Sequence, residues 1–385
     1  MSTSQSVRLL SLNQNLAGSG MLGHETAEDR MRQIGASDLR LRSLVTKLPP
    51  LGLAGRVAGR PLPWLWYLDL DLHPTRWHIV ESLRARRTLK KLLTTFDANV
   101  VHVSTHTAAL LCVRLMRQRP FMISVDVPIW PWHEMGIWRP VRSYSRASLW
   151  LSERLERRAF GNAALVLAYS EWAARLVQQE CPSARVRIWH PGVDANRFSP
   201  ASERPAGGSH IPYRLLFVGA RFAAKGGEDL LEAVGHRLGR DIELDIVTPD
   251  PVASRPGLGV HRLEPGAPQL VDLYRSADLL CLPTRGDSFG WVVLEAMSCG
   301  VPVIASRMGA IPELLRPGTA EEAGIVVDAR DPGALAQALD ELLADPERRR
   351  SMGAAGRRAV LARHSSEVQM KRFLELVGEV LESAR

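Results

Sequence analysis

The chain has 385 residues, of which 45% are hydrophobic and 23% are charged, and its formal net charge is +8. A chain of this length is expected to form two domains, or three, each able to bury a core. The apolar fraction excludes a disordered chain, the 30 glycines and 25 prolines show no collagen-like period, and no run of about 18 apolar residues predicts a membrane span. The first residues lack the features of a secretory signal, so we expect a cytoplasmic protein.

Positive charge is concentrated in the first half. Residues 1–200 contain 27 Lys and Arg against 15 Asp and Glu, a net +12, whereas residues 201–385 contain 22 against 26, a net −4. This asymmetry predicts attraction to an anionic membrane surface or a phosphorylated acceptor; an Arg-rich proteome bias is the alternative explanation. No nucleic-acid-binding motif is found, so no nucleic-acid partner is expected. The four cysteines have no metal-ligand spacing and are expected to be buried thiols.

The first half alternates short apolar runs with amphipathic stretches. The runs are rich in β-branched residues and apolar on both faces, as in a parallel sheet covered by helices. The expected strands are Val7–Leu12, Val100–Ser104, Phe121–Val125, Leu165–Tyr169 and Val186–Trp189. The expected helices are His24–Ile34, Ile79–Leu93 and Ala147–Phe160.

Residues 199–212 concentrate Pro, Ser and Gly and predict a linker, after which the alternation restarts. The expected strands are Arg214–Val218, Glu243–Val247, Leu279–Leu282, Val303–Ala305 and Ile325–Val327. The expected helices are Glu228–Leu238, Gln269–Ser276, Trp291–Ser298 and Pro332–Leu343. This pattern predicts an α/β protein with two tandem Rossmann-like, doubly wound domains facing a cleft, residues 1–198 and 213–365. A final amphipathic helix, in residues 366–385, is expected to pack back on the first domain.

The segment LFVGARFAAKGG, residues 216–227, predicts a strand that ends at Gly219, a short loop with Arg221 and Lys225, and a helix that begins near Gly227. Two cations at the carboxyl end of a strand, beside the first N–H groups of a helix, are typical of a diphosphate site.

The segment PTRGDSFGWVVLE, residues 283–295, places Asp287 on a loop and Glu295 eight residues further, inside a helix. Eight helical residues span about 12 Å, roughly the reach from a hexose across a diphosphate to a ribose. Asp287 is therefore expected to accept hydrogen bonds from sugar hydroxyls, and Glu295 from ribose hydroxyls. Gly290 lets the backbone approach a ligand closely.

These segments resemble the retaining, nucleotide-sugar-dependent glycosyltransferases of family 4 (group 1), which have the GT-B fold. The matching pieces are PGVD-x-x-RF at 191–198, G-x-R-x3-KG at 219–226, the acid-x7-Glu motif at 287–295, EAM-x-x-G-x-PVIAS at 295–306 and GAIPEL at 309–314. The resemblance covers residues 186–330 closely. The first half matches only in outline.

The resemblance implies a role for each matching residue. Arg221 and Lys225 would neutralise the leaving diphosphate, Asp287 would bind the donor sugar, and Glu295 would bind the ribose. Further donor contacts would come from the strand end and the start of the helix: Gly219, Ser288, Phe289, Gly290 and Trp291. The glycine-rich loop of the family corresponds to NLAGSGMLG at 15–23, where Gly18 and Gly20 are the donor-binding candidates.

The chain departs from the family pattern at two positions. The acidic motif begins with Asp287 where Glu is usual, which shortens the carboxylate by one methylene. Asp126 stands where many members have a His that acts at the cleft, and it is the remaining catalytic candidate. Asp126 accepts hydrogen bonds but cannot donate as imidazolium does. His102, His106 and His133 are alternatives for that role.

The expected activity is that of a retaining hexosyltransferase acting on a hydroxyl acceptor, such as a lipid-linked glycan or glycolipid in envelope polysaccharide synthesis. Soluble sugars and small metabolites are alternative acceptors, and peripheral membrane contact is expected through the basic first half. No cofactor and no essential metal are expected, because Arg221 and Lys225 supply the positive charge, although Asp69 and Asp71 form a D-x-D motif. The alternatives are a non-catalytic nucleotide-sugar-binding subunit or scaffold, or another GT-B chemistry such as an epimerase or phosphorylase.

Overall fold

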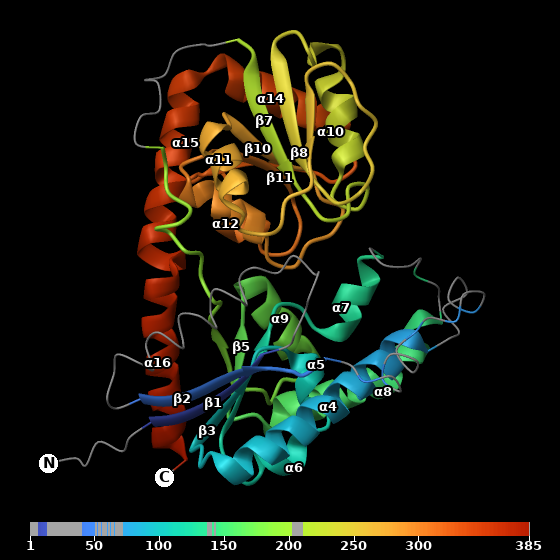
Figure 1. Cartoon of the computed structure of the whole chain (residues 1–385), viewed down its shortest axis with the longest axis vertical. Helices are drawn as coiled ribbons and strands as arrows, with labels where there is room; N and C mark the ends of the chain where they lie inside the picture. The colour runs from blue at the N-terminus through green and yellow to red at the C-terminus, as the bar shows by residue number, and fades with distance from the viewer. Residues whose placement is uncertain are drawn as a thin grey trace, which may run out of the picture. The chain divides into compact units, whose positions relative to one another are not determined.

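The computed structural model describes residues 7–13, 41–50, 72–136, 144–201 and 211–384, with the isolated positions 52, 55, 60, 62, 65 and 141. These residues form two compact units (Figure 1). Unit 1 contains the described chain up to Pro191 and from Met370 onward, and unit 2 runs from Gly192 to Gln369. The prediction of a two-domain α/β protein is confirmed.

Unit 1 is built on a parallel sheet in the order β2-β1-β3-β4-β5-β6. Its strands are β1 (Val7–Asn13), β2 (Leu41–Lys47), β3 (Val100–Val103), β4 (Phe121–Val125), β5 (Leu165–Ala168) and β6 (Val186–Ile188). Its helices are α4 (His73–Thr95), α5 (His106–Ala109), α6 (Val113–Met116), α7 (Ile129–Glu134), α8 (Ser145–Asn162) and α9 (Glu171–Glu180). Every residue of β3, β4 and β5 is buried, because neighbours on both sides and both faces cover these central strands.

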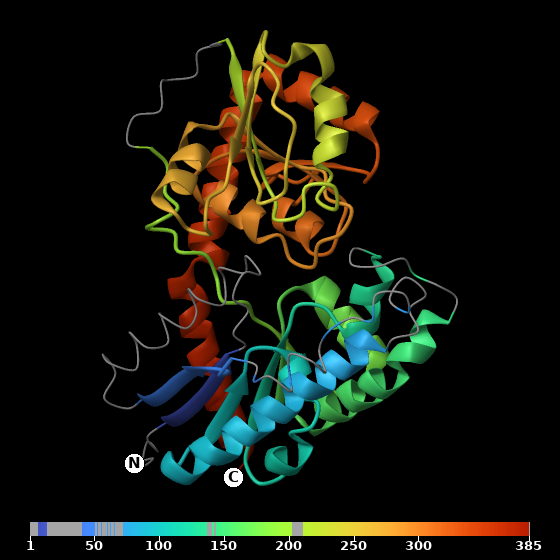
Figure 2. The same cartoon turned by 45° about the vertical axis from the view of Figure 1, so that its right-hand side comes forward.

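Unit 2 repeats this plan with a parallel sheet in the order β12-β11-β10-β7-β8-β9. Its strands are β7 (Tyr213–Val218), β8 (Ile242–Val247), β9 (Leu258–His261), β10 (Leu279–Leu282), β11 (Val303–Ser306) and β12 (Gly324–Val327). Its helices are α10 (Gly227–Val234), α11 (Pro268–Ser276), α12 (Trp291–Ser298), α13 (Ile311–Leu315), α14 (Pro332–Ala344) and α15 (Pro346–Ala359). Figure 2 shows α10 on one side of the strands and the orange helices α11 and α12 on the other.

The order of strands in unit 2 reverses once. The chain builds β7, β8 and β9 outward in one direction and then returns to place β10 on the other side of β7. The loops that leave β7 and β10 therefore diverge from adjacent strand ends. In open parallel sheets this topological switch point is where ligands bind.

Eight of these strands and helices were not predicted: β2, β9, α5, α6, α7, α9, α13 and α15. Strands β2 and β9 lie at the edges of their sheets and pair on one side only, so they lack a continuous apolar run. Helix α15 reads PERRRSMGAAGRRA, and its five arginines obscure the apolar stripe that packs Met352 and Ala355 inward. The expected helix His24–Ile34 and the candidates Gly18, Gly20, Asp69 and Asp71 lie outside the described residues.

The boundary of the first unit differs from the predicted one at residue 198. Unit 2 begins at Gly192 because the exit segment is bound to unit 2. Arg357 Nη1 donates to the carbonyls of Ala195 and Phe198 at 3.0 and 3.1 Å and to the carbonyl of Ser298 at 2.8 Å. The segment that was expected to close the first domain is thereby held on α12 and α15.

Helix α16 (Ser366–Ser383) returns the chain to unit 1 at Met370. Phe373 on this helix is fully buried, and its ring lies 5.1 Å from that of His102 and 4.8 Å from that of Trp189. The helix therefore contributes to the core of unit 1.

Among the helices of the described chain, none combines the length and apolar character needed to span a membrane.

Candidate functional site

The loops after β7 and β10 meet at the switch point of unit 2. Lys225 Nζ lies 2.7 Å from Asp287 Oδ2 and donates to the carbonyl of Gly286 at 3.1 Å. The two side chains are 24% and 16% exposed, so the pair is accessible from solvent. Lys225 and Asp287 are far apart in the sequence, and the fold brings them together at the switch point of unit 2, where open parallel sheets bind ligands.

Glycines permit this close approach of the two loops. A Cβ on Gly219 would lie 2.9 Å from Lys225 Cβ, so the absence of a side chain there makes room for the stem of the lysine. Gly226 has φ +77°, and a Cβ on it would lie 1.9 Å from the carbonyl oxygen of Pro283. Gly226 is therefore required both by its left-handed backbone and by the contact with the second loop.

Arg221 lies on the same loop as Lys225. The loop closes as a single turn, because the N–H of Lys225 donates to the carbonyl of Arg221 at 2.8 Å. Asp250, from the loop after β8, accepts from the N–H of Phe222 at 2.8 Å and so holds the turn in place. Asp250 was not predicted as a site residue, and its signal was its place in the loop three residues after β8 ends at Val247.

Asp287 has a second partner. Its Oδ1 accepts from the N–H groups of Phe289 at 3.2 Å and Gly290 at 3.1 Å, just before α12 begins. Gly290 has φ +89°, a left-handed conformation that favours glycine at this turn. Asp287 therefore links Lys225 to the turn that precedes α12, and its shorter side chain suits these local hydrogen bonds.

The other residues of this segment are packed rather than extended into solvent. Phe289 is buried and meets the half-buried Trp291 edge to face, with ring centroids 4.8 Å apart. The carbonyl of Ser288 accepts from the N–H of Ala310 at 3.1 Å. Gly309 packs against the backbone of Asp287 and Ser288, and a Cβ on Gly309 would collide with the Asp287 carbonyl. The GAIPEL motif is thus the support of the loop.

Glu295 lies on α12 and is buried, with 5% exposure. Tyr274 Oη of α11, itself fully buried, donates to Glu295 Oε2 at 2.7 Å. Burial raises the pKa of Glu295 to about 7, while the Tyr274 hydrogen bond and Arg197 act in the opposite direction. Tyr274 is a site residue that was missed, although a tyrosine inside an amphipathic helix, with an apolar body and a polar tip, was a usable signal.

Asp126 lies in unit 1, directly after β4 and half-buried, whereas all the other described candidates lie in unit 2. It faces the buried Tyr169, whose pKa is raised first by burial and then by this carboxylate.

No group of three His, Cys, Asp or Glu side chains in the described chain is arranged to hold a metal.

The alternative histidines have separate surroundings in unit 1. His102 is buried, with Nδ1 3.0 Å from Ser11 Oγ and Nε2 2.9 Å from Ser124 Oγ, so it joins three strands as a core residue. His106 Nε2 lies 3.3 Å from Glu156 Oε1. Burial lowers the pKa of His106 to about 3 and raises that of Glu156, so this pair is neutral.

The fold is similar to that of solved glycosyltransferases of the GT-B class. Sucrose-phosphate synthase from Thermosynechococcus elongatus superposes with a TM-score of 0.70 at 18% identity, covering 98% of this chain and 100% of that one. Anabaena HepE, in complex with UDP-glucose, superposes with a TM-score of 0.66 at 17% identity, covering 97% and 99%. At these identities the likeness shows the fold alone.

The sequence comparisons identify the family. Residues 212–345 match the model described as "Glycosyl transferases group 1", and residues 50–197 match "Glycosyltransferase Family 4". The chain therefore belongs to the family 4, group 1 glycosyltransferases. D-inositol 3-phosphate glycosyltransferase of Corynebacterium jeikeium is 34% identical over 200 residues, 45% of this chain and 47% of that protein. The chain spans about half the length of the curated relatives that it matches.

Proposed function

We propose that this protein transfers a sugar from a nucleotide diphosphate sugar to a hydroxyl acceptor. The observation that carries the proposal is the Lys225–Asp287 pair, which joins the loops after β7 and β10 at the switch point of unit 2. The names of the curated relatives and the UDP-glucose bound to HepE support a nucleotide-sugar donor.

In the proposed reaction, Lys225 and Arg221 stabilise the charge that develops on the diphosphate as its bond to the anomeric carbon breaks. The acceptor hydroxyl attacks from the face that the diphosphate leaves, so the anomeric configuration is retained. Asp287 accepts from hydroxyls of the donor sugar, and Glu295 accepts from the ribose. Two cations provide the charge that a metal supplies in other transferases, so no essential metal is proposed.

We extend the proposal to the acceptor and its location. The basic first half favours an acceptor at an anionic surface, such as a lipid-linked glycan or glycolipid at the inner face of the membrane, with envelope polysaccharide synthesis as the process. Soluble acceptors, including phosphorylated polyols of the kind named for the relatives, are the alternatives.

Ligand-induced thermal shifts test the donor first. UDP, GDP, ADP, TDP and their common sugars are screened with EDTA and with Mg²⁺, since a ligand at a hundredfold excess over Kd stabilises the folded state by about 2.7 kcal/mol. We expect one base to raise Tm clearly, with the same shift in EDTA. If none of these nucleotides or nucleotide sugars raises Tm, the proposal is wrong.

A non-catalytic subunit that binds a nucleotide sugar is the second candidate, because Asp126 stands where the family has a histidine. The donor found in the screen is therefore incubated with acceptor candidates, and released nucleoside diphosphate is measured. Release that depends on the acceptor supports transfer. Binding without release under every acceptor supports the scaffold.

A further inference from the structure

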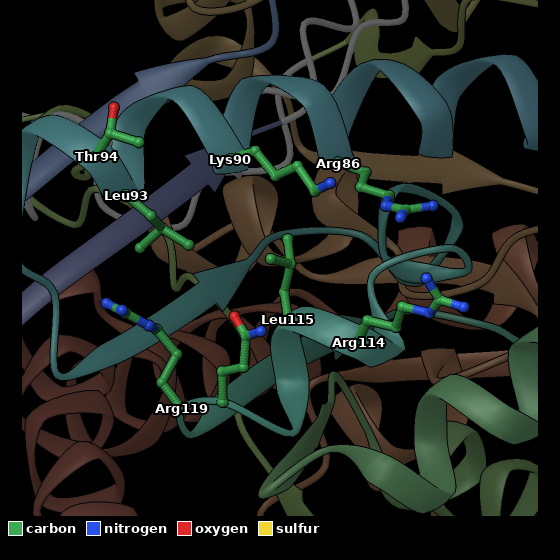
Figure 3. Close-up of a pocket in the computed structure, with 8 residues that line it drawn as sticks. Arg86, Lys90, Leu93, Thr94, Arg114, Leu115 and Arg119 are labelled. Carbon is green, nitrogen blue, oxygen red and sulfur yellow. The ribbon is translucent and has the colours of Figure 1, made fainter.

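Unit 1 contains a basic groove that the proposed transfer does not use. It has a volume of about 450 Å³ and lies between the last turns of α4 and the segment that leads from α6 to β4 (Figure 3). Four cations line it, Arg86, Lys90, Arg114 and Arg119, above an apolar floor of Leu93 and Leu115.

The groove lies at the amino ends of the strands. Helix α4 ends at Thr95, shortly before β3 begins at Val100, and Arg119 lies two residues before β4 begins at Phe121. Ligands of open parallel sheets bind at the carboxyl ends. The groove is therefore distinct from the strand-end position of Asp126, and it belongs to a different unit from Lys225 and Asp287.

The positive charge of the groove is not compensated by acidic neighbours. None of the residues that line it is Asp or Glu, and within the described chain none of its four cations forms an ion pair with a carboxylate. Other arginines of unit 1 do: Arg84 lies 2.6 Å from Glu81, one turn earlier on α4, and Arg157 lies 3.2 Å from Glu180. Arg87 and Lys91 of α4 also lack a carboxylate partner within the described chain, so what distinguishes the four groove cations is that they line one groove.

Three of the groove cations lie near one another, whereas Arg119 lies at the opposite end of the groove, beyond Leu115 in the view of Figure 3. Arg86 and Lys90 are four residues apart on α4 and so share a helix face, although like charges at this spacing repel. Figure 3 shows the Arg114 side chain rising from α6 toward Arg86 of α4. Arg119 is held in place, because its Nη1 donates to the carbonyl of Ala98 at 2.8 Å. An anion between the two elements would relieve the repulsion.

We propose that the groove of Arg86, Lys90, Arg114 and Arg119 binds a phosphate group, carried either by a phospholipid headgroup or by a soluble phosphate ester. Guanidinium groups bind phosphate through paired hydrogen bonds, and lysine adds a compact charge. The leucine floor suits the carbon atoms next to such a group. This site is independent of the proposed transfer activity, so each proposal can fail without the other.

Titration calorimetry of the full chain with inorganic phosphate tests the site. Lys90→Gln/Arg114→Gln removes two exposed groove cations, and Arg87→Gln/Lys91→Gln removes two exposed cations of α4 that do not line the groove. Lys90→Gln alone replaces the first variant if that variant does not fold. We expect one phosphate per groove, bound at least about tenfold more weakly by the groove variant and unchanged in the control.

Three results would overturn the proposal. The first is no phosphate binding by the unmodified chain. The second is an equal loss in both double variants, which indicates general charge attraction. The third is binding that Lys225→Ala abolishes, because such phosphate lies in unit 2.

Vesicle sedimentation distinguishes the two sources of the phosphate. Vesicles of phosphatidylcholine with and without phosphatidic acid are mixed with the unmodified chain and both double variants. Binding to phosphatidic acid that only the groove variant loses supports a lipid headgroup. Phosphate binding without vesicle binding supports a soluble phosphate ester.

Discussion

Lys225 Nζ donates to Asp287 Oδ2 at 2.7 Å, so the residue assigned to the diphosphate is bonded to the residue assigned to the sugar. A lysine ammonium has three N–H donors, of which one points to Asp287 and one to the carbonyl of Gly286. In the proposed function, the third donor is left for a phosphate oxygen. The two contacts fix the ammonium in the unliganded chain, which would reduce the ordering that donor binding requires.

Lys225→Ala is expected to lower kcat about 10²- to 10³-fold, since it removes a cation placed where charge develops. Arg221→Ala is expected to act in the same direction. Arg262→Ala, which removes an exposed arginine of unit 2, is the control. Initial rates at saturating donor measure the effect, and near-normal turnover in both loop variants would remove the basis of the proposed mechanism.

Asp287→Asn and Asp287→Ala separate the two roles of this side chain. Asn keeps an oxygen that accepts from the N–H groups of Phe289 and Gly290 but loses the charge that pairs with Lys225. Ala loses both. We expect both variants to lose transfer activity, and Asp287→Ala alone to lose about 1 kcal/mol of stability from the missing hydrogen bonds to these two N–H groups. Urea unfolding of the two variants checks this; equal stabilities would exclude a stabilising role for these hydrogen bonds.

Gly226→Ala is expected to destabilise unit 2 more than Gly318→Ala does. Both glycines have a φ near +75°, but a Cβ on Gly318 meets open space, whereas one on Gly226 meets the Pro283 carbonyl. The strained backbone costs about 1 kcal/mol in each variant, and the collision adds to this only at Gly226. Thermal unfolding measures the difference. Equal losses of Tm would show that the two loops can separate without cost.

The buried Glu295 predicts a pH-dependent stability. Burial raises its folded pKa to about 7, so the folded state binds an extra proton between about pH 4.5 and 7. Its contribution is fully present below the unfolded pKa and is lost as the pH rises through 7. The loss is on the order of 3 kcal/mol.

The variant Glu295→Gln stays neutral and keeps an oxygen for Tyr274. It should therefore be more stable than the unmodified chain at pH 8 and similar to it at pH 4. Urea unfolding at both values tests this. A difference that does not change with pH would show that Glu295 does not titrate on folding.

The sequence predicted the central strands well because a strand covered on both faces must be apolar throughout, as in β4 and β10. Edge strands carry no such constraint, and β2 and β9 were missed. The residue types of the site also followed from the motifs. The Lys225–Asp287 and Tyr274–Glu295 hydrogen bonds could not be predicted from the motifs, because each joins elements that only the strand order of unit 2 brings close together.

Helix α16 has a consequence for the synthesis of the protein. Phe373 completes the core around His102 and Trp189, yet it is translated after the whole of unit 2. Within the described residues, unit 2 runs without interruption from Gly192 to Gln369, and it has all its strands once residue 327 has been made. During synthesis, the second unit thus has all its strands before the segment that completes the core of the first unit has been made.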